Sequence, residues 1–260
     1  MGNLLFLEER RRAILQRLED DGRVTVRDLS AMMGVSAVTI RQDLRALEEE
    51  GLLERTYGGA VARTGTMRLK ELAFNVRLHK QRAEKRALAA FAARFVANGA
   101  SVALDSSTSV YALLPYLKRL EKLTVVTNCL VLAQSFLDKS QFQVLVTGGR
   151  VRADSISLVG LPESLPHVNL NVGFFSAHGL AENVGLTDID PDEVVIKQAL
   201  IARCVRPIFL LDSSKWGAIA PYTITPVDLI QHVVTTEKSP PAMVARLRER
   251  GITVDVIPVD

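Results

Sequence analysis

The sequence from residue 35 to residue 47 reads Val35-Ser36-Ala37-Val38-Thr39-Ile40-Arg41-Gln42-Asp43-Leu44-Arg45-Ala46-Leu47. Apolar residues recur at helical spacing at Ile40, Leu44 and Leu47, and Ser36 stands where a helix N-cap is needed. The stretch therefore predicts an amphipathic helix that begins after Ser36. We interpret it as a DNA recognition helix, the alternative being an ordinary helix with a solvated face. Side chains that can hydrogen-bond to base edges or phosphates lie on its other face: Thr39, Arg41, Gln42 and Arg45.

The segments before this helix complete a small module. A first helix is predicted over residues 7–20 and a second over residues 28–33, and Gly34 permits a tight turn before the recognition helix. Helix, helix, glycine turn and capped helix is the order of a helix-turn-helix. Leu29 and Met32 of the second helix are expected to point inward. The arginines of the first helix are expected to point outward: Arg10, Arg11, Arg12 and Arg17.

Two short extended pieces follow the recognition helix, at residues 52–55 and 56–61, around the Gly58-Gly59 bend. They predict a wing, a small hairpin whose Arg55 reaches a phosphate or the minor groove, although Gly58-Gly59 could be only a turn. Residues 1–60 hold nine arginines and no lysine against eleven acidic residues, a net charge of −2, whereas residues 61–86 carry +6. DNA binding must therefore rest on where single arginines stand, with the basic stretch adding non-specific phosphate attraction.

This module resembles the winged helix of the DeoR family of bacterial transcription regulators. The matching motifs are Arg12-Ala13-Ile14-Leu15, Val35-Ser36, Thr39-Ile40-Arg41, Asp43-Leu44, Leu47-Glu48, Gly51 and Arg55 through Gly58-Gly59-Ala60. The sequence departs from the family at Gln42, where an arginine is usual, and at Met33, where an aromatic residue is usual. The first departure alters which bases or phosphates are touched, and the second changes core packing.

After this module the chain predicts a linker and a larger α/β domain. Periodicity is lost over residues 63–79, so we place the winged helix-turn-helix domain at 1–62, a linker at 63–79 and the α/β domain at 80–260. A long helix is expected over residues 81–97. Short β-rich runs then alternate with helical ones, which predicts a mainly parallel sheet with helices on both faces. The predicted strands are 101–104, 124–127, 143–146, 172–176, 207–211, 232–235 and 252–257, and the helices 111–120, 130–137, 192–204 and 241–250.

Polar residues follow five of these strands, where open parallel sheets bind their ligands. The loop Asp105-Ser106-Ser107-Thr108-Ser109 opens onto a helix N-terminus and suits a phosphate, while Asp105 and Asp212 suit sugar hydroxyls and Lys215 or Arg150 supplies positive charge. The expected effector is a phosphorylated sugar or polyol, although each loop taken alone could be a helix cap or a turn. The remaining strand-end candidates are Asn128, Gly148, Gly149, Ser176 and Gly179, and His178 is either a ligand contact or a structural histidine.

A further polar group comprises Asp188, Glu193 and Lys197. Because Glu193 and Lys197 lie four residues apart, an exposed intrahelical ion pair is the alternative reading. The DeoR family's effector domain typically carries similar motifs, matched here at Asp105, Asn128, Gly148, Asp188, Glu193 and Lys215. Ser107 replaces the family's usual glycine and Ser109 its usual threonine.

The resemblance implies a fold similar to sugar-phosphate isomerases and coenzyme A transferases, which raises a rival hypothesis. An isomerase-like enzyme fused to a DNA-binding module needs a general base, and Glu193, Asp105 or Asp188 could serve. A DNA-binding protein without a small ligand is a third possibility. We expect a cytoplasmic, non-enzymatic regulator, most simply a repressor, that binds an operator in double-stranded DNA as a homo-oligomer, without membrane, metal or cofactor. Cys129 and Cys204 are expected to be buried reduced thiols.

Overall fold

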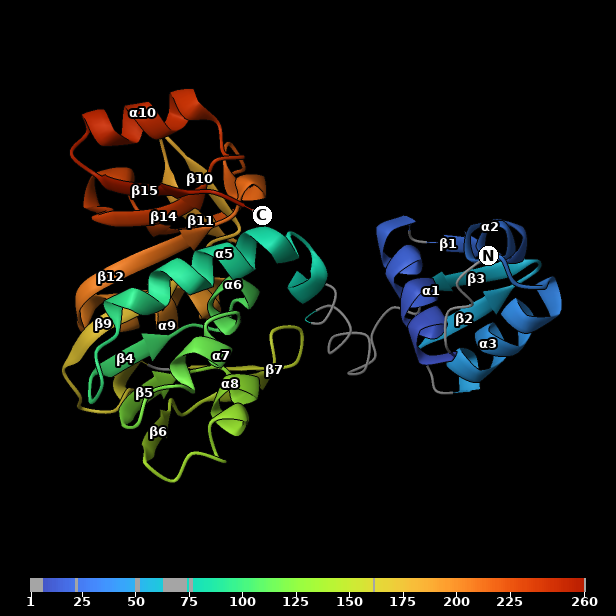
Figure 1. The fold of residues 1–260 in the computed structure, drawn as a ribbon, viewed down its shortest axis with the longest axis horizontal. Helices are drawn as coiled ribbons and strands as arrows, with labels where there is room; N and C mark the ends of the chain where they lie inside the picture. Colours follow the sequence, from blue (N-terminus) through green and yellow to red (C-terminus); the bar gives the residue numbers. More distant parts are fainter. Residues whose placement is uncertain are drawn as a thin grey trace. The chain divides into compact units, whose positions relative to one another are not determined.

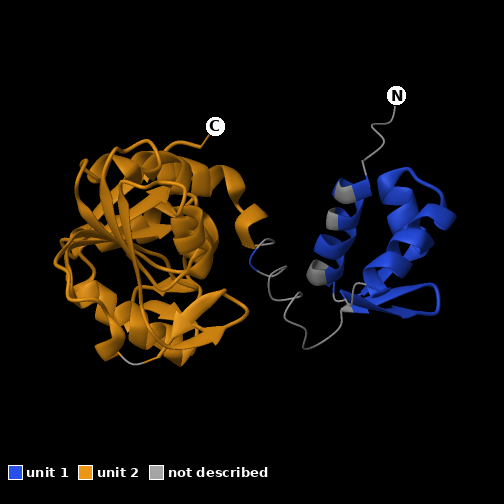
Figure 2. Ribbon diagram, turned by 90° about the horizontal axis from the view of Figure 1, so that it is seen from below, with its two compact units in different colours: residues 1–76 blue, residues 77–260 orange. Residues whose placement is uncertain are grey.

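A computed structural model describes residues 7–21, 23–49, 52–62, 74, 77–160 and 162–259. The chain divides into two compact units, residues 1–76 and 77–260 (Figure 2). Most of the predicted linker lies outside the described residues. Within the described ranges, no helix is long and apolar enough to cross a membrane.

The first unit is a helix-turn-helix followed by a wing (Figure 1). Strands β2 and β3 form the predicted hairpin, and β3 also pairs with β1, which gives the antiparallel order β1-β3-β2. Gly34 has a φ of 65°, so it occupies the left-handed region that lets the chain turn between α2 and α3. The elements are α1 (Leu7–Asp21), β1 (Arg23–Thr25), α2 (Val26–Met33), α3 (Ala37–Glu49), β2 (Leu53–Thr56) and β3 (Gly59–Ala62).

Three sequence predictions for this unit are wrong: the start of α2, the inward position of Met32 and the outward position of Arg10. Helix α2 begins at Val26 rather than Asp28, so Val26, Leu29 and Met33 form its buried face, and Met32 is 54% exposed. Arg10 does not point outward. Its Nε lies 2.5 Å from Oδ2 of the buried Asp43 in α3, and Arg11 Nε lies 3.5 Å from the same carboxylate. Arg17 is exposed as predicted, and the side chain of Arg12 lies outside the described part of the structure.

The second unit is built on a seven-stranded sheet in which every pairing is parallel, in the order β15-β14-β12-β9-β4-β5-β6. All seven predicted strands are confirmed. Their residues alternate between the two faces, so that Phe174 packs into one core and Phe175 into the other. The strands are β4 (Ser101–Leu104), β5 (Leu123–Thr127), β6 (Phe142–Val146), β9 (Leu170–Phe175), β12 (Cys204–Leu211), β14 (His232–Thr236) and β15 (Thr253–Ile257).

Helices cover both faces of this sheet, as predicted. Four pack into the core that contains Phe174, and two into the core that contains Phe175. The predicted helix 111–120 is wrong, because the chain forms two short helices there, with Pro115 in the first turn of the second. The predicted helix 81–97 ends earlier, in the 3-10 turn η1 (Ala93–Phe95). The first group is α5 (Arg82–Ala92), α6 (Thr108–Tyr111), α7 (Leu114–Leu117) and α8 (Leu130–Ser135), and the second is α9 (Pro191–Ala202) and α10 (Pro241–Glu249).

Two small antiparallel sheets were not predicted, because their strands are short and lack a clear alternation. One pairs β7 (Arg150–Arg152) with β8 (Ser157–Val159). The other has the order β10-β11-β13, formed by β10 (Gly179–Ala181), β11 (Gly185–Asp188) and β13 (Tyr222–Thr225).

Both cysteines are free thiols, but only Cys129 is fully buried. Cys204 is partly exposed because it lies at the start of β12, where its Sγ donates to the carbonyl of Leu200 at 3.2 Å. Burial raises the pKa of Cys129 to about 11 and that of Cys204 to about 12, so both thiols stay protonated at neutral pH.

Candidate functional site

One polar cavity of the second unit opens where the strand order reverses. The chain leaves β4 toward β5 and β6 on one side, and later returns to place β9 on the other side of β4. Ligands in open parallel sheets bind at this point, beyond the carboxyl ends of the strands. The cavity has a volume of about 90 Å³, which suits a small polar molecule, since roughly 10–15 Å³ of such volume holds one water.

The Ser/Thr loop after β4 is held in place by Asp105. Its Oδ1 accepts from the backbone N–H of Ser107 at 2.9 Å, and its Oδ2 accepts from that of Ser176, beyond β9, also at 2.9 Å. The Ser107 hydroxyl then caps α6 by accepting from the N–H of Val110. Asp105 is 1% exposed and does not line the cavity. It therefore positions the two strand-end loops that flank the cavity.

Lys197 forms the centre of a buried ion cluster. Its Nζ donates to Asp188 Oδ2 and to the carbonyl of Ser176, both at 2.8 Å, and lies 3.3 Å from Asp105 Oδ2. Burial opposes the charge on Lys197, but the carboxylates of Asp188 and Asp105 outweigh it and raise the pKa. Burial alone would raise the pKa of Asp188, but the Lys197 ammonium lowers it below the ordinary value. The exposed Glu193–Lys197 pair considered from sequence is therefore wrong.

The carboxylate of Glu193 is satisfied on both oxygens. Oε1 accepts from the hydroxyls of Ser155, at 2.7 Å, and Ser157, and Oε2 accepts from the Ser106 hydroxyl at 3.1 Å and from Asn128 Nδ2 at 3.2 Å. This places the Glu193 side chain as an anchor between the loop after β4 and the β7–β8 hairpin. It leaves little acceptor capacity for a substrate proton.

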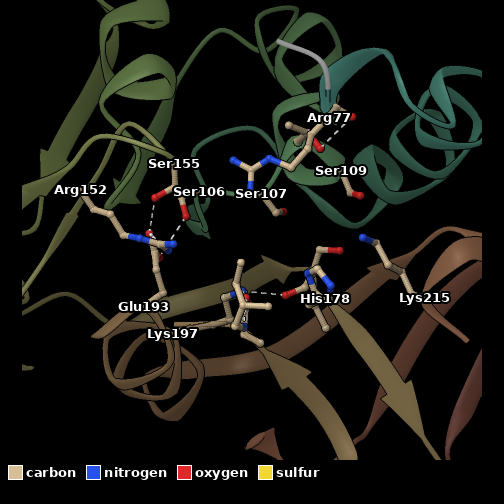
Figure 3. Close-up of a pocket in the computed structure, with 15 residues that line it drawn as sticks. Arg77, Ser106, Ser107, Ser109, Arg152, Ser155, His178, Glu193, Lys197 and Lys215 are labelled. Atoms are coloured by element: carbon tan, nitrogen blue, oxygen red, sulfur yellow. Dashed lines mark hydrogen bonds and ion pairs between the residues drawn. The ribbon is translucent and has the colours of Figure 1, made fainter. Parts of the chain in front are cut away.

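Besides Lys197, three cations line the cavity from different sides (Figure 3): Arg77, Arg152 and Lys215. Arg152 is neutralised by Asp154 and Asp190, each at 3.2 Å. Among the described residues, no carboxylate lies within ion-pair distance of Arg77 or Lys215.

Burial and neighbouring cations lower the pKa values of two side chains that line the cavity. The pKa of His178 is lowered, first by burial and then by the nearby Lys215 ammonium. The pKa of Arg77 is likewise lowered by burial and then by Arg152. In both cases a neighbouring cation adds to the effect of burial, and the same cations can attract an anion into the cavity.

Only part of the predicted effector site lines the cavity. Asp105, Asn128 and Asp212 are buried behind the cavity rather than on its wall. The predicted residues that line it are Ser106, Ser107, Thr108, Ser109, Ser176, Asp188, Glu193, Lys197 and Lys215.

The other predicted effector residues do not line this cavity. Arg150 points elsewhere and pairs with Asp192 at 2.6 Å on the surface. Gly149 is needed for packing, because a Cβ there would lie 2.3 Å from the carbonyl of Val159. Gly148, the residue before Gly149, packs near Ser164, and Gly179 packs against Ala218.

Sequence reasoning missed Arg77, Arg152, Ser155 and Ile189 as cavity-lining residues. A rule based on strand ends could not find Arg77, which lies in a short helical segment, residues 77–79, before α5. Arg152 and Ser155 belong to a hairpin that was not predicted. Trp216 packs in the core, where its Nε1 donates to the hydroxyl of Thr235 at 3.0 Å.

In the first unit, α3 presents the predicted reading face. The Ser36 hydroxyl accepts from the N–H of Thr39 at 3.1 Å, which confirms the predicted cap. Arg41, Gln42 and Arg45 are exposed and Thr39 is partly exposed. Arg45 pairs with Glu49 at 3.2 Å, an exposed contact that a phosphate can replace at small cost.

The wing is braced against the recognition helix. Glu48 of α3 accepts from the backbone N–H of Arg55 at 2.9 Å, and its Oε2 lies 3.7 Å from the Arg55 guanidinium. Arg55 remains exposed. The predicted contact residues of helix and wing are thus linked through one carboxylate, and their contacts with DNA stay a prediction.

Comparisons with known proteins agree with this architecture. The DeoR-like helix-turn-helix domain matches residues 10–72, and the DeoR C terminal sensor domain matches residues 80–237. The chain belongs to the DeoR family. It is 33% identical to the HTH-type transcriptional regulator GolR of Listeria innocua, over 97% of this chain and 99% of that protein. It is 30% identical to the putative aga operon transcriptional repressor of Escherichia coli O157:H7, over 96% and 93%.

Solved structures resemble this DeoR-family chain only distantly. A ribose 5-phosphate isomerase from Plasmodium falciparum has a TM-score of 0.38 and 13% identity, covering 51% of this chain and 52% of that one. The translation initiation factor eIF-2B of Pyrococcus horikoshii has a TM-score of 0.41 and 14% identity, covering 82% of each. Likeness at this level carries no argument about activity.

Proposed function

We propose that this DeoR-family regulator binds an operator through α3 and the wing and is controlled by a phosphorylated sugar or polyol bound in the sensor cavity. The observation that carries the effector proposal is the pairing of two cations, Arg77 and Lys215, with the hydroxyl-rich loop 106–109 around one small cavity. An anion there gains charge-assisted hydrogen bonds and reduces the mutual repulsion of the cations.

The rest of the cavity supports a ligand that carries hydroxyl groups. Asp188 lines the cavity with 17% of its side chain exposed, so its carboxylate can accept from a hydroxyl while Lys197 holds it in place. Ser176 and the loop hydroxyls add donors and acceptors nearby. A ligand that carries an anionic group and several hydroxyls would fit these side chains, and a phosphate ester of a sugar or polyol is such a ligand.

The isomerase alternative fits this geometry less well. A general base needs a carboxylate that is available to a substrate proton. Both oxygens of Glu193 already accept from serine or asparagine donors, and Asp105 is buried behind the cavity. Asp188 is the remaining candidate base, but the Lys197 ammonium holds its pKa below the ordinary value, which makes it a weak proton acceptor.

One winged helix reads only a few base pairs, so specific binding needs two or more copies at fixed spacing. We therefore propose a homo-oligomer, a dimer or a tetramer, that acts in the cytoplasm, most simply as a repressor.

The effector proposal predicts a ligand-induced thermal shift. Ribose 5-phosphate, glucose 6-phosphate, fructose 1-phosphate and glycerol 3-phosphate are titrated against the full chain. At about 100 times its Kd, a matching ligand should raise the Tm of the sensor unit by roughly 5–11 °C. Lys215→Ala should at least halve the shift at the same concentration, because an unpaired cation of the cavity is lost. Lys238→Ala, an exposed lysine away from the cavity, is the matched control. The proposal fails if no compound shifts wild type, or if Lys215→Ala keeps the full shift.

A further inference from the structure

Arg77 lines the cavity from outside the strand-end loops, in the short helical segment of residues 77–79 that precedes α5. It is the first residue of the sensor unit, directly after the segment that leads from the DNA-binding unit. Its side chain lines the cavity together with Ser107 and Lys215 (Figure 3). Its Nη2 also donates to the carbonyl of Asp154 at 2.9 Å. The chain therefore enters the sensor unit at the wall of its ligand cavity.

The main chain of Arg77 is fixed to the hydroxyl-rich loop. Its carbonyl accepts from Lys85 Nζ, and the Thr108 hydroxyl lies 3.4 Å from the same oxygen. Lys85 is 5% exposed and also donates to the Thr108 hydroxyl at 3.0 Å. Arg77, α5 and the start of α6 are thus joined by one buried ammonium group.

Helix α5 is tied to a second cavity loop through the neighbouring Glu84. Its carboxylate accepts from the N–H of Ser213 at 2.8 Å and from the Ser213 hydroxyl at 2.7 Å. Ser213 begins the turn η3 (Ser213–Lys215), which presents Lys215 to the cavity. Two successive residues of α5 therefore hold the loops that present the hydroxyls and the unpaired lysine.

The Arg77 side chain has donor capacity left for a ligand. Among the described residues its guanidinium is bonded only to a backbone carbonyl, and a guanidinium presents five N–H donors in a planar fork. A phosphate or carboxylate in the cavity can accept two of these in parallel. Such a contact would restrain the residue at which the tether to the DNA-binding unit begins.

We propose that Arg77 contacts the anionic group of the effector and transmits occupancy of the cavity to the tether. This inference rests on the effector proposal above. Coupling between two sites is a free energy that requires differential contacts in the two states. Arg77 can supply such a contact. Its side chain lines the cavity, and its main chain is the first of the sensor unit, where the segment from the DNA-binding unit ends.

The test measures the Kd of the full chain for its own promoter fragment, with and without saturating ligand. The ligand is whichever of the four phosphate esters gives the largest thermal shift with wild type. Wild type should change its Kd for DNA by at least about 5-fold. Arg77→Ala should bind the ligand at least about 10-fold more weakly, and at saturation its Kd for DNA should change less than 2-fold. Arg77→Lys should restore part of this response.

Two further variants separate transmission from binding. Lys215→Ala should need more ligand, yet at saturation it should change its DNA affinity as much as wild type does. Arg82→Ala removes an exposed arginine of α5 that does not line the cavity, and should behave like wild type throughout. Amide hydrogen exchange across residues 78–86 should slow on ligand binding in wild type and in Lys215→Ala, but not in Arg77→Ala.

The outcomes distinguish the two proposals. If wild type shows no thermal shift, the effector proposal fails and this inference falls with it. If wild type responds but Arg77→Ala at saturation keeps the wild-type change in DNA affinity, only the role of Arg77 is overturned. If Arg77→Ala melts well below wild type without ligand, its loss of response could come from unfolding. The role of the guanidinium is then tested with Arg77→Lys. A full response and full ligand affinity in that folded variant would show that the guanidinium fork is not used.

Discussion

Lys197→Met is expected to lower the free energy of unfolding of the sensor unit by about 3–5 kcal/mol, the cost of removing one partner from a buried ion cluster. In wild type the Lys197 ammonium contacts Asp188 and Asp105, whose side chains are 17% and 2% exposed. Methionine fills a similar volume but leaves both carboxylates without their cation. The Tm of this unit should fall by roughly 6–20 °C in calorimetry of the full chain.

The pH dependence separates this charge effect from lost packing. In wild type Lys197 lowers the pKa of Asp188, so the stability that this pair contributes is lost only as the pH falls below the ordinary value near 3.8. In the variant, burial without the cation raises the pKa of Asp188. The loss of stability caused by the ionised Asp188 is then complete above this raised pKa, and it disappears as the carboxyl becomes protonated at lower pH. The deficit of Lys197→Met should therefore shrink between pH 7 and pH 5.

Lys118→Met is the matched control, because Lys118 pairs with Asp138 at 2.7 Å on the surface, where a lost ion pair costs far less. A deficit for Lys197→Met no larger than that of the control, or one that stays constant with pH, would contradict this account of the cluster.

Asp43→Ala is expected to destabilise the DNA-binding unit by about 2–4 kcal/mol. The Asp43 side chain is 3% exposed, and it accepts from Arg10 Nε at 2.5 Å and Arg10 Nη2 at 3.2 Å, with Arg11 Nε at 3.5 Å. Alanine leaves two partly buried arginines without this carboxylate. A module of about 60 residues has only about 3–9 kcal/mol of stability in total. DNA binding should weaken accordingly, although Asp43 is buried and is not on the predicted reading face.

The double variant Arg10→Met/Asp43→Leu tests whether charge is the cause. Replacing a buried pair by apolar residues of similar size is often neutral, so this variant should recover most of the stability lost in Asp43→Ala. Asp21→Ala, which removes an exposed pair with Arg17, should change little. Circular dichroism melts of the three variants provide the measurement, and an Asp43→Ala melt equal to that of Asp21→Ala would refute the prediction.

The fold was predictable from sequence because it depends on patterns that sequence displays directly. The β-rich runs of the second unit alternate with helical segments, and all seven strands were found. Ser36, Gly34 and the apolar spacing of α3 likewise predicted the helix-turn-helix. Errors arose where a tertiary contact overrode a local pattern. Arg10 reads as a surface residue of α1, yet Asp43, 33 positions later, draws it inward.

The candidate site was only partly predictable, for a similar reason. Strand-end loops identified the serine loop and Lys215, because parallel strands bring their carboxyl ends together. The same rule selected Asp105 and Asn128, whose side chains turn away from the cavity and support Lys197 and Glu193 instead. It could not find Arg77, since nothing in the local sequence shows that the residues before α5 pass the cavity.

The most direct test of the central account is the affinity of the full chain for its own promoter fragment at physiological salt. Anisotropy titrations compare that fragment with a scrambled duplex of the same composition, each with and without the phosphate ester that stabilises the sensor unit. The account predicts binding at least about 1,000-fold tighter to the promoter than to the scrambled duplex. It also predicts a change of at least about 5-fold in the promoter Kd when the ester is added. Equal affinity for the two duplexes, or a promoter Kd that the ester leaves unchanged, would contradict it.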